Sequence, residues 1–179
     1  MGSERPVGDI CAILRLDEEA EERLLALRQA AGAPPAPFYA HVTLAHYQGL
    51  EKAAAVDWAA RCASAWRPIP LRFDGAGLLT PDCAACFLAM DAPLQDCYRA
   101  FHREYDRFCD QWTALSHGRW RPHCSLVTDT DADYFALARA LERAFRPFTG
   151  RAAALELSEV LPQGFDVFAS WQLEKECFV

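Results

Sequence analysis

The chain has 179 residues, 52% hydrophobic and 24% charged, which is typical of one globular domain large enough to bury a core. The net charge of −7 and the isoelectric point of about 5.2 exclude a protein that coats long nucleic acid, because such binding needs many Lys and Arg contacts to phosphates. No run approaches the roughly 18 apolar residues of a membrane span, and the first residues lack a signal peptide's apolar core, so we expect a cytoplasmic protein without a membrane partner.

The first part of the chain alternates between strand and helix patterns. Residues 9–16 are apolar and end at Asp17, which predicts a strand followed by a helix N-cap. Residues 17–32 begin with acidic residues, carry apolar residues at helical spacing and end in Gly, as an amphipathic helix does. Residues 38–47 predict a strand, and the Ala-rich residues 50–66 predict a helix.

The second part continues the alternation. Residues 69–91 predict two strands separated by Gly and Pro, and residues 92–112 predict one long helix, since apolar side chains recur every three or four residues. Residues 120–128 predict a strand, and residues 129–148 a capped helix. Residues 151–176 predict two strands joined as a hairpin.

These elements follow the order β-α-β-α-β-β-α-β-α-β-β, with a strand in each half that carries the tetrad His-x-Thr/Ser-Leu between two helices. We therefore expect an α+β fold of two similar lobes within one domain, residues 1–179. The helices should lie outside, and the sheets should face a shared cleft.

The two tetrads, HVTL and HCSL, place a histidine and a hydroxyl on one face of each strand. Residues two apart in a strand share a face, so His41 projects with Thr43, and His123 projects with Ser125. One imidazole can act as base while the other acts as acid, and the hydroxyls can hold a phosphate oxygen. No cluster of Asp or Glu lies nearby, so the pattern predicts acid–base cleavage of a phosphodiester without a metal or other cofactor.

The tetrads, 82 residues apart, and the RPH that opens the second one resemble the 2H phosphoesterase superfamily, which includes 2′-5′ RNA ligase-like proteins and cyclic nucleotide phosphodiesterases. The resemblance implies a pseudo-twofold fold with two antiparallel sheets facing a central groove. It also implies that His41 and His123 are catalytic and that Thr43 and Ser125 bind phosphate. The implied substrates are 2′,3′-cyclic phosphates or 2′-5′ linkages of small nucleotides and RNA ends, and we expect a monomer.

Other aromatic and basic residues are candidates for substrate binding. Tyr39 and Arg121 lie two positions before each tetrad histidine and share its face, where they either contact the substrate or line the rim of the groove. Phe165, Phe168 and Trp171 either form a wall on which a base stacks or pack in the core.

The remaining histidines and the cysteines suggest no second site. His46 reads as a surface residue at a strand end, and His102 and His117 as ordinary surface or helix residues. Cys83 and Cys86 form a CxxC pair without the second pair that a zinc site usually has, which favours two packed thiols.

The sequence therefore predicts a phosphodiesterase that opens a 2′,3′-cyclic phosphate on a small nucleotide or RNA terminus. Two alternatives stay open. The same chemistry can act on a 2′-5′ bond, as in a 2′-5′ phosphodiesterase or RNA ligase. The second alternative is a binding module that holds a phosphorylated nucleotide without turnover. Binding alone, however, does not need two titrating groups.

Overall fold

The computed structural model describes residues 8–33, 39–128, 133–161 and 164–173, and the order of its elements is the one that the sequence predicts. The strands are β1 (Ile10–Leu16), β2 (His41–Tyr47), β3 (Ile69–Thr80), β4 (Cys83–Leu88), β5 (His123–Val127), β6 (Phe148–Leu161) and β7 (Gly164–Gln172). The helices are α1 (Glu18–Ala30), α2 (Lys52–Ala65), α3 (Ala92–Phe101) and α4 (Tyr134–Ala144). Two short 3₁₀ turns, Asp106–Phe108 and Leu115–His117, follow α3.

The strands form one antiparallel sheet in the order β2-β1-β6-β3-β4-β5, with β7 also paired to β6. Strand β6 belongs to two lobes, because its residues 152–159 pair with β1 and its residues 148–152 pair with β3. We call the part around β1, β2 and β7 the first lobe, and the part around β3, β4 and β5 the second lobe. The α+β prediction is confirmed, and the two expected sheets are joined through β6 into one.

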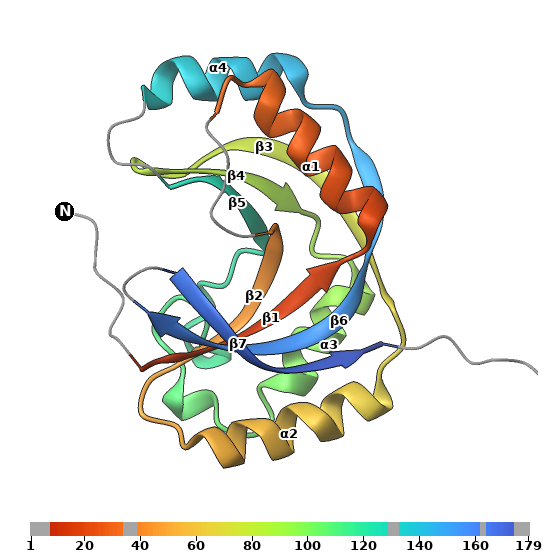
Figure 1. Ribbon diagram of the computed structural model, residues 1–179, viewed down its shortest axis with the longest axis vertical. Coiled ribbons are helices and arrows are strands. Elements are labelled where there is room, and N and C mark those ends of the chain that lie inside the picture. The colour runs from red at the N-terminus through yellow and green to blue at the C-terminus, as the bar shows by residue number, and fades with distance from the viewer. Residues whose placement is uncertain (1–7, 34–38, 129–132, 162–163, 174–179) are drawn as a thin grey trace, which may run out of the picture.

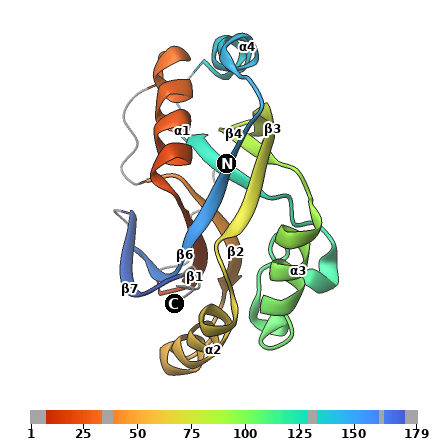
Figure 2. The ribbon, with the colours of Figure 1, turned by 90° about the vertical axis from the view of Figure 1, so that its right-hand side faces the viewer.

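The helices lie on the outside of this sheet (Figure 1 and Figure 2). Helices α1 and α4 contact each other and cover the second lobe, where α4 packs on β3 and β4 and α1 reaches β5. Helix α2 packs on β6 and β7 of the first lobe and contacts α3. We call the face of the sheet that points away from these helices the inner face.

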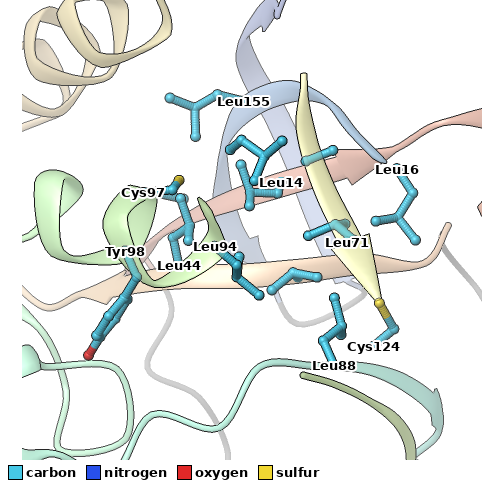
Figure 3. Close-up of a cluster of buried hydrophobic side chains, with 14 of the residues drawn as sticks. Leu14, Leu16, Leu44, Leu71, Leu88, Leu94, Cys97, Tyr98, Cys124 and Leu155 are labelled. Carbon is cyan, nitrogen blue, oxygen red and sulfur yellow. The ribbon is translucent and has the colours of Figure 1, made fainter. Parts of the chain in front are cut away.

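A single large core lies between the helices and the sheet (Figure 3). Leu14 of β1, Leu44 of β2 and Leu155 of β6 are fully buried there, and Cys124 brings β5 into the same cluster. Each buried Leu side chain contributes about 1.5–3 kcal/mol relative to an exposed one. Since neighbouring residues in a strand alternate between faces, burial of these positions directs the residues beside them to the inner face.

The ends of the helices follow local signals in two cases. The side chain of Asp17 accepts a hydrogen bond from the backbone N–H of Ala20 at 3.2 Å, so it caps α1 as predicted. Helix α4 ends at Ala144, shortly before Pro147, because a proline disfavours helical backbone at the residue that precedes it. Residues 129–132 of the predicted helix lie outside the described residues.

The prediction of one long helix over residues 92–112 is wrong beyond Phe101, where α3 ends. The chain turns instead, and Tyr105 adopts left-handed backbone with φ of 60°. The carboxylate of Asp106 then accepts the backbone N–H groups of Leu115 and Ser116 at 2.7 and 3.2 Å. Apolar spacing continues through this segment because Tyr105 and Phe108 still pack against the core, whereas Trp112 is exposed and the backbone is no longer helical.

Residues 102–120, which we call the edge segment, cover the outer edge of β2 that β1 does not pair. Five hydrogen bonds of 2.8 to 3.0 Å join the edge segment to the backbone of residues 43–48: Trp120 to Thr43, His102 to Leu44, Asp110 to His46, His46 to Thr113 and Gln48 to Phe108. An uncovered edge strand would expose unpaired backbone groups to other chains. The edge segment therefore completes the hydrogen bonding of the strand that carries the first tetrad.

Gly150 of β6 lies directly beneath the start of α1, and a side chain there has no room. An added Cβ would lie 2.6 Å from the Cβ of Ala20 and 3.2 Å from Oδ1 of Asp17. We expect Gly150→Ala to lower the free energy of unfolding by about 1–3 kcal/mol, measured by urea denaturation. Gly77→Ala is the matched control, because its Cβ would meet only the ring of Phe87 at 3.9 Å. Equal stability of the two variants would contradict the close packing of α1 on β6.

Candidate functional site

The two tetrads alternate between the core and the inner face as predicted. Val42 and Leu44 are fully buried, whereas His41 and Thr43 are partly exposed. Strand β5 repeats this pattern, with Cys124 and Leu126 in the core and the intervening histidine and serine partly exposed. Each strand therefore presents an imidazole and a hydroxyl on one face.

The two strands that carry the tetrads are the two ends of the sheet, and they contact each other (Figure 1). The indole Nε1 of Trp120, three residues before β5, donates to the carbonyl of Thr43, the third residue of β2, at 2.9 Å. This hydrogen bond links the beginnings of the two strands. The fold thus brings together two motifs that are far apart in the sequence.

Both tetrad imidazoles are oriented by the same local hydrogen bond. Nδ1 of His41 lies 3.1 Å from the carbonyl oxygen of Tyr39, and Nδ1 of His123 lies 2.7 Å from that of Arg121. A carbonyl oxygen can only accept, so Nδ1 is the protonated nitrogen of each ring. In the neutral form of both rings, Nε2 is therefore the nitrogen that can take up a proton.

In the first lobe, an arginine and a tyrosine lie beside the imidazole. Arg15 of β1 stands opposite His41 in the strand register, and its guanidinium lies 4.1 Å from the centre of the Tyr39 ring. The ring of Phe165 meets that of His41 edge to face, with 5.8 Å between centres. The sequence predicted Tyr39 at this place but missed Arg15, whose only signal is a charge inside an apolar strand.

The second lobe also has a guanidinium stacked on an aromatic ring beside its imidazole. Here the arginine lies two residues before the histidine, and the aromatic residue stands opposite it. Phe87 of β4 stands opposite His123, and the guanidinium of Arg121 lies 3.9 Å from the centre of its ring. A cation and an aromatic ring in such contact attract each other. Each imidazole is therefore bordered by a cation stacked on an aromatic ring, and Phe87 is a further residue that sequence reasoning missed.

Glu156 of β6 interacts with several of the first-lobe residues through its buried carboxylate. It is 4% exposed and accepts hydrogen bonds from the hydroxyls of Tyr39 and, at 3.1 Å, Ser170, while Nη1 of Arg15 lies 4.0 Å away. Burial and the neighbouring Glu156 carboxylate raise the pKa of Tyr39. Tyr39 is thus held as a neutral phenol whose ring position is fixed by a buried carboxylate.

We expect Tyr39→Phe to lower the free energy of unfolding by about 1–3 kcal/mol, because a hydrogen bond to a buried charged group is lost. Tyr47→Phe is the matched control. The Tyr47 hydroxyl is buried without a hydrogen-bond partner among the described residues, so its removal should leave stability unchanged or raise it. Urea denaturation of both variants measures the difference, and equal values would contradict the role of Glu156.

The three aromatic residues of the last strand do not share one location. Trp171 stands opposite the buried Leu155 and, like Phe168, packs against the main core. Only Phe165 of the three lies beside His41. Trp171 therefore packs with the core and, unlike Phe165, has no ring contact with His41 among the described residues.

The CxxC pair does not form a shared ligand set. Cys86 is fully buried in the core, while Sγ of Cys83 lies 3.7 Å from Oγ of Ser125 on the inner face. Burial raises the pKa of Cys86 to about 12, so its thiol stays protonated. The expectation of two packed thiols therefore holds for Cys86 only, because Cys83 is partly exposed beside the second tetrad.

Two of the other histidines are buried, contrary to the prediction for His46. Its ring lies between carboxylates, with Nε2 3.1 Å from Asp9 and Nδ1 3.0 Å from Asp110. Burial acts to raise the pKa of Asp110, but hydrogen bonds from His46 and Thr113 outweigh it and lower that pKa to about 2. The sequence could not reveal this burial, because the edge segment that covers the ring is distant in the chain.

His102 is also buried, at the end of α3, whereas His117 is exposed in a turn as predicted. Within the described ranges, one group of three side chains can share a metal ion: His102, Asp106 and Cys109. Neither tetrad histidine belongs to it. No described helix is long and apolar enough to cross a membrane.

Comparison with known proteins gives a family match and structural matches. The profile of the 2′-5′ RNA ligase superfamily matches residues 16–161. The fold is similar to the crystal structure of TT0787 from Thermus thermophilus, with a TM-score of 0.65, 16% identity, and 94% of this chain and 99% of that chain covered. It is also similar to E. coli LigT complexed with 3′-AMP, with a TM-score of 0.61, 16% identity, and 95% and 100% covered. No curated protein sequence matches.

Proposed function

The chain belongs to the 2′-5′ RNA ligase superfamily, among the 2H phosphoesterases, and we propose that it hydrolyses 2′,3′-cyclic phosphates of small nucleotides or RNA ends without a metal. The observation that carries this proposal is the matched pair of imidazoles. Both lie on contacting edge strands, and both have Nδ1 bound to the carbonyl two residues earlier. Because Nδ1 is engaged in both rings, Nε2 of one imidazole can accept a proton while Nε2 of the other, when protonated, donates one in the same displacement.

In the proposed reaction, Nε2 of one imidazole takes a proton from water while the water oxygen attacks phosphorus. The bond from phosphorus to one ribose oxygen breaks, and the other imidazole, protonated at the start, gives its proton to that oxygen. The hydroxyls of Thr43 and Ser125 donate to the nonbridging oxygens, where charge builds in the transition state. Arg121 adds a positive charge beside His123.

The residues that surround the imidazoles support a reaction in which no metal takes part. The one group of potential metal ligands among the described residues lies beside α3 and includes no tetrad residue. Near His41, the carboxylate of Glu156 is already engaged by Tyr39 and Ser170. In this proposal, a general acid and base perform the proton transfers that a metal-bound water would otherwise share.

The test is turnover by the wild-type protein in the presence of a chelator. The panel contains 2′,3′-cyclic mononucleotides, 3′,5′-cyclic nucleotides, 2′-5′ oligoadenylate and RNA with a cyclic phosphate end. We expect hydrolysis of the 2′,3′-cyclic compounds, followed by phosphorus NMR. Binding of these compounds without turnover would indicate the binding module instead, and loss of turnover on chelation at a temperature where the protein stays folded would contradict the mechanism.

Action on a 2′-5′ bond is the second candidate, favoured by the family match. The step at phosphorus is equivalent, and only the leaving group differs. The net charge of −7 disfavours a long RNA partner, so we place this candidate second. Cleavage of 2′-5′ oligoadenylate faster than of the cyclic mononucleotides would reverse the order.

A further inference from the structure

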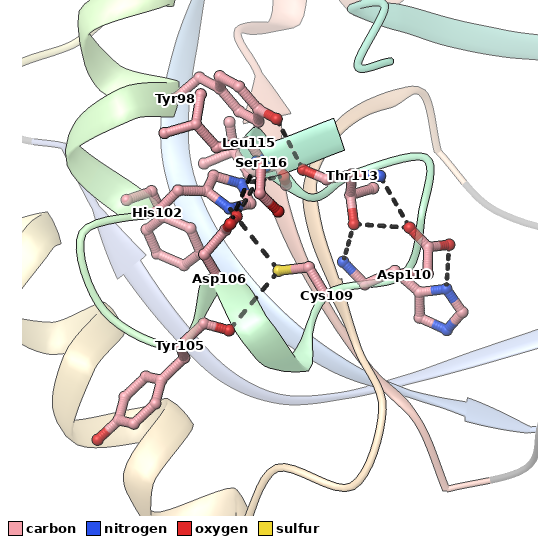
Figure 4. A network of polar contacts seen from close by, with 12 residues as sticks. Tyr98, His102, Tyr105, Asp106, Cys109, Asp110, Thr113, Leu115 and Ser116 are labelled. Atoms are coloured by element: carbon pink, nitrogen blue, oxygen red, sulfur yellow. Dashed lines mark hydrogen bonds and ion pairs between the residues drawn. The ribbon is translucent and has the colours of Figure 1, made fainter. Parts of the chain in front are cut away.

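A histidine, an aspartate and a cysteine converge where α3 meets the edge segment, and none of the three belongs to a tetrad (Figure 4). The ligand atoms of His102, Asp106 and Cys109 all lie within 4.8 Å of one another. His102 and Cys109 contribute Nδ1 and Sγ, which are 3.7 Å apart. We propose that these three side chains bind one zinc ion, or a similar divalent transition metal, that fastens the edge segment to β2.

The orientation of His102 is that of a metal ligand. Its Nε2 lies 3.0 Å from the carbonyl oxygen of Leu44, so Nε2 carries a proton. In the neutral ring, the lone pair of Nδ1 then faces Asp106 Oδ1 at 2.8 Å and the sulfur of Cys109. A carboxylate cannot donate a hydrogen bond, so this contact needs either a second proton on the imidazole, which then forms an ion pair with Asp106, or a metal cation between the two groups. Metal-binding histidines commonly donate their other nitrogen to a backbone carbonyl in this way.

The second ligand is held just as firmly. Backbone N–H groups of Leu115 and Ser116 donate to the two oxygens of Asp106, and such donors orient the carboxylates that bind metals. Tyr105, the only non-glycine residue with positive φ among the described residues, makes the turn that leads from α3 into Asp106 and Cys109. The backbone thus returns two ligands to the end of the helix that carries the third.

The ligand set indicates the kind of ion. Burial and the neighbouring Asp106 raise the pKa of the Cys109 thiol to about 12, so the ion would have to displace the thiol proton when it binds. A thiolate, an imidazole and a carboxylate together suit zinc, whereas calcium and magnesium prefer oxygen ligands alone. In a tetrahedral site with Zn–S of about 2.3 Å and Zn–N of about 2.0 Å, sulfur and nitrogen are about 3.5 Å apart. The observed 3.7 Å agrees with this geometry. The distance of 2.8 Å between Nδ1 and Oδ1 would have to open by about half an ångström.

The ion would act on the fold and not on the reaction. His102 binds the carbonyl of Leu44, which lies next to Thr43 in β2, while the side chain of Leu44 faces the core. Zinc at this place would therefore hold the edge segment against the strand that carries the first tetrad. This inference is independent of the proposed function, because its readouts are metal binding and thermal stability.

The experiment uses the full chain, stripped of metal with a chelator and then titrated with Zn²⁺ and Co²⁺. We expect one ion per chain, a rise in Tm with Zn²⁺, and the thiolate-to-metal absorption band of tetrahedral Co²⁺. Cys109→Ser should abolish that band and weaken zinc binding by on the order of 100-fold or more. Cys62→Ser, which alters a buried thiol on α2 outside the group, should keep both.

A second measurement needs no variant. Zinc should slow the alkylation of Cys109 in the wild-type protein, followed by mass spectrometry, and should leave the rate at the partly exposed Cys83 unchanged. If metal binding is absent, or if the Co²⁺ band persists in Cys109→Ser and zinc does not protect Cys109, the group is only a network of hydrogen bonds. Either result would overturn the inference.

Discussion

Replacing His41 or His123 by alanine should lower kcat for a 2′,3′-cyclic nucleotide by about 10²–10⁴-fold, because each removes one partner of the proton transfer. The double variant should lose less than the product of the two, since both groups act in one step. His117→Ala is the control, because it removes an exposed histidine in a turn. Retention of activity within about tenfold of wild type in both single variants would contradict the mechanism.

Asparagine at the same two positions separates proton transfer from positioning. The Asn side-chain amide can donate to the carbonyl that now accepts from Nδ1, but it does not titrate. We therefore expect His41→Asn and His123→Asn to be as inactive as the alanine variants while keeping wild-type stability. Substantial recovery of kcat in the asparagine variants would mean that the histidines position the substrate.

The pH dependence assigns the two roles. With one base and one acid, kcat/KM should follow a bell-shaped curve whose limbs belong to the coupled pair. In the variant that lacks the general base, the pH profile of the residual activity should lose its acidic limb. In the variant that lacks the general acid, the profile should lose its basic limb. Loss of the same limb in both variants would show that the imidazoles do not divide the roles.

The alternation of polar and apolar residues was sufficient to predict the tetrads and the strands that carry them. His41 and Thr43 face inward because Val42 and Leu44 are needed in the core, and this alternation is visible in the sequence alone. The order of elements followed in the same way from caps, Gly and Pro. Local patterns thus predict which residues lie on the inner face.

Features that depend on strand register or on distant segments could not be predicted. Arg15 and Phe87 become neighbours of the imidazoles only because β1 pairs with β2 and β4 with β5 at one register, which no short pattern determines. His102 acquires its partners because α3 ends at Phe101, where apolar spacing predicts continuation. The burial of His46 likewise depends on the edge segment. Nonlocal contacts decide these positions.

After the loss of the histidines, removal of the tetrad hydroxyls should cause the largest fall in activity. Thr43→Val and Ser125→Ala should each lower kcat by about 10²–10³-fold with little change in stability, because a donor to the developing charge is lost. Thr43→Ser keeps the donor and should retain most of the activity. Ser158→Ala is the control, since its buried hydroxyl has no hydrogen-bond partner among the described residues.

The split between kcat and KM decides what the hydroxyls do. If they stabilise the transition state, kcat and kcat/KM fall together; if they only bind the substrate, KM rises and kcat is kept. Because Thr43 and Ser125 stand beside imidazoles on opposite strands, we expect the first pattern in both variants. A fall in kcat for one variant and a rise in KM for the other would show that the two lobes hold the phosphate unequally, and the pseudo-twofold mechanism would then be wrong in its symmetry.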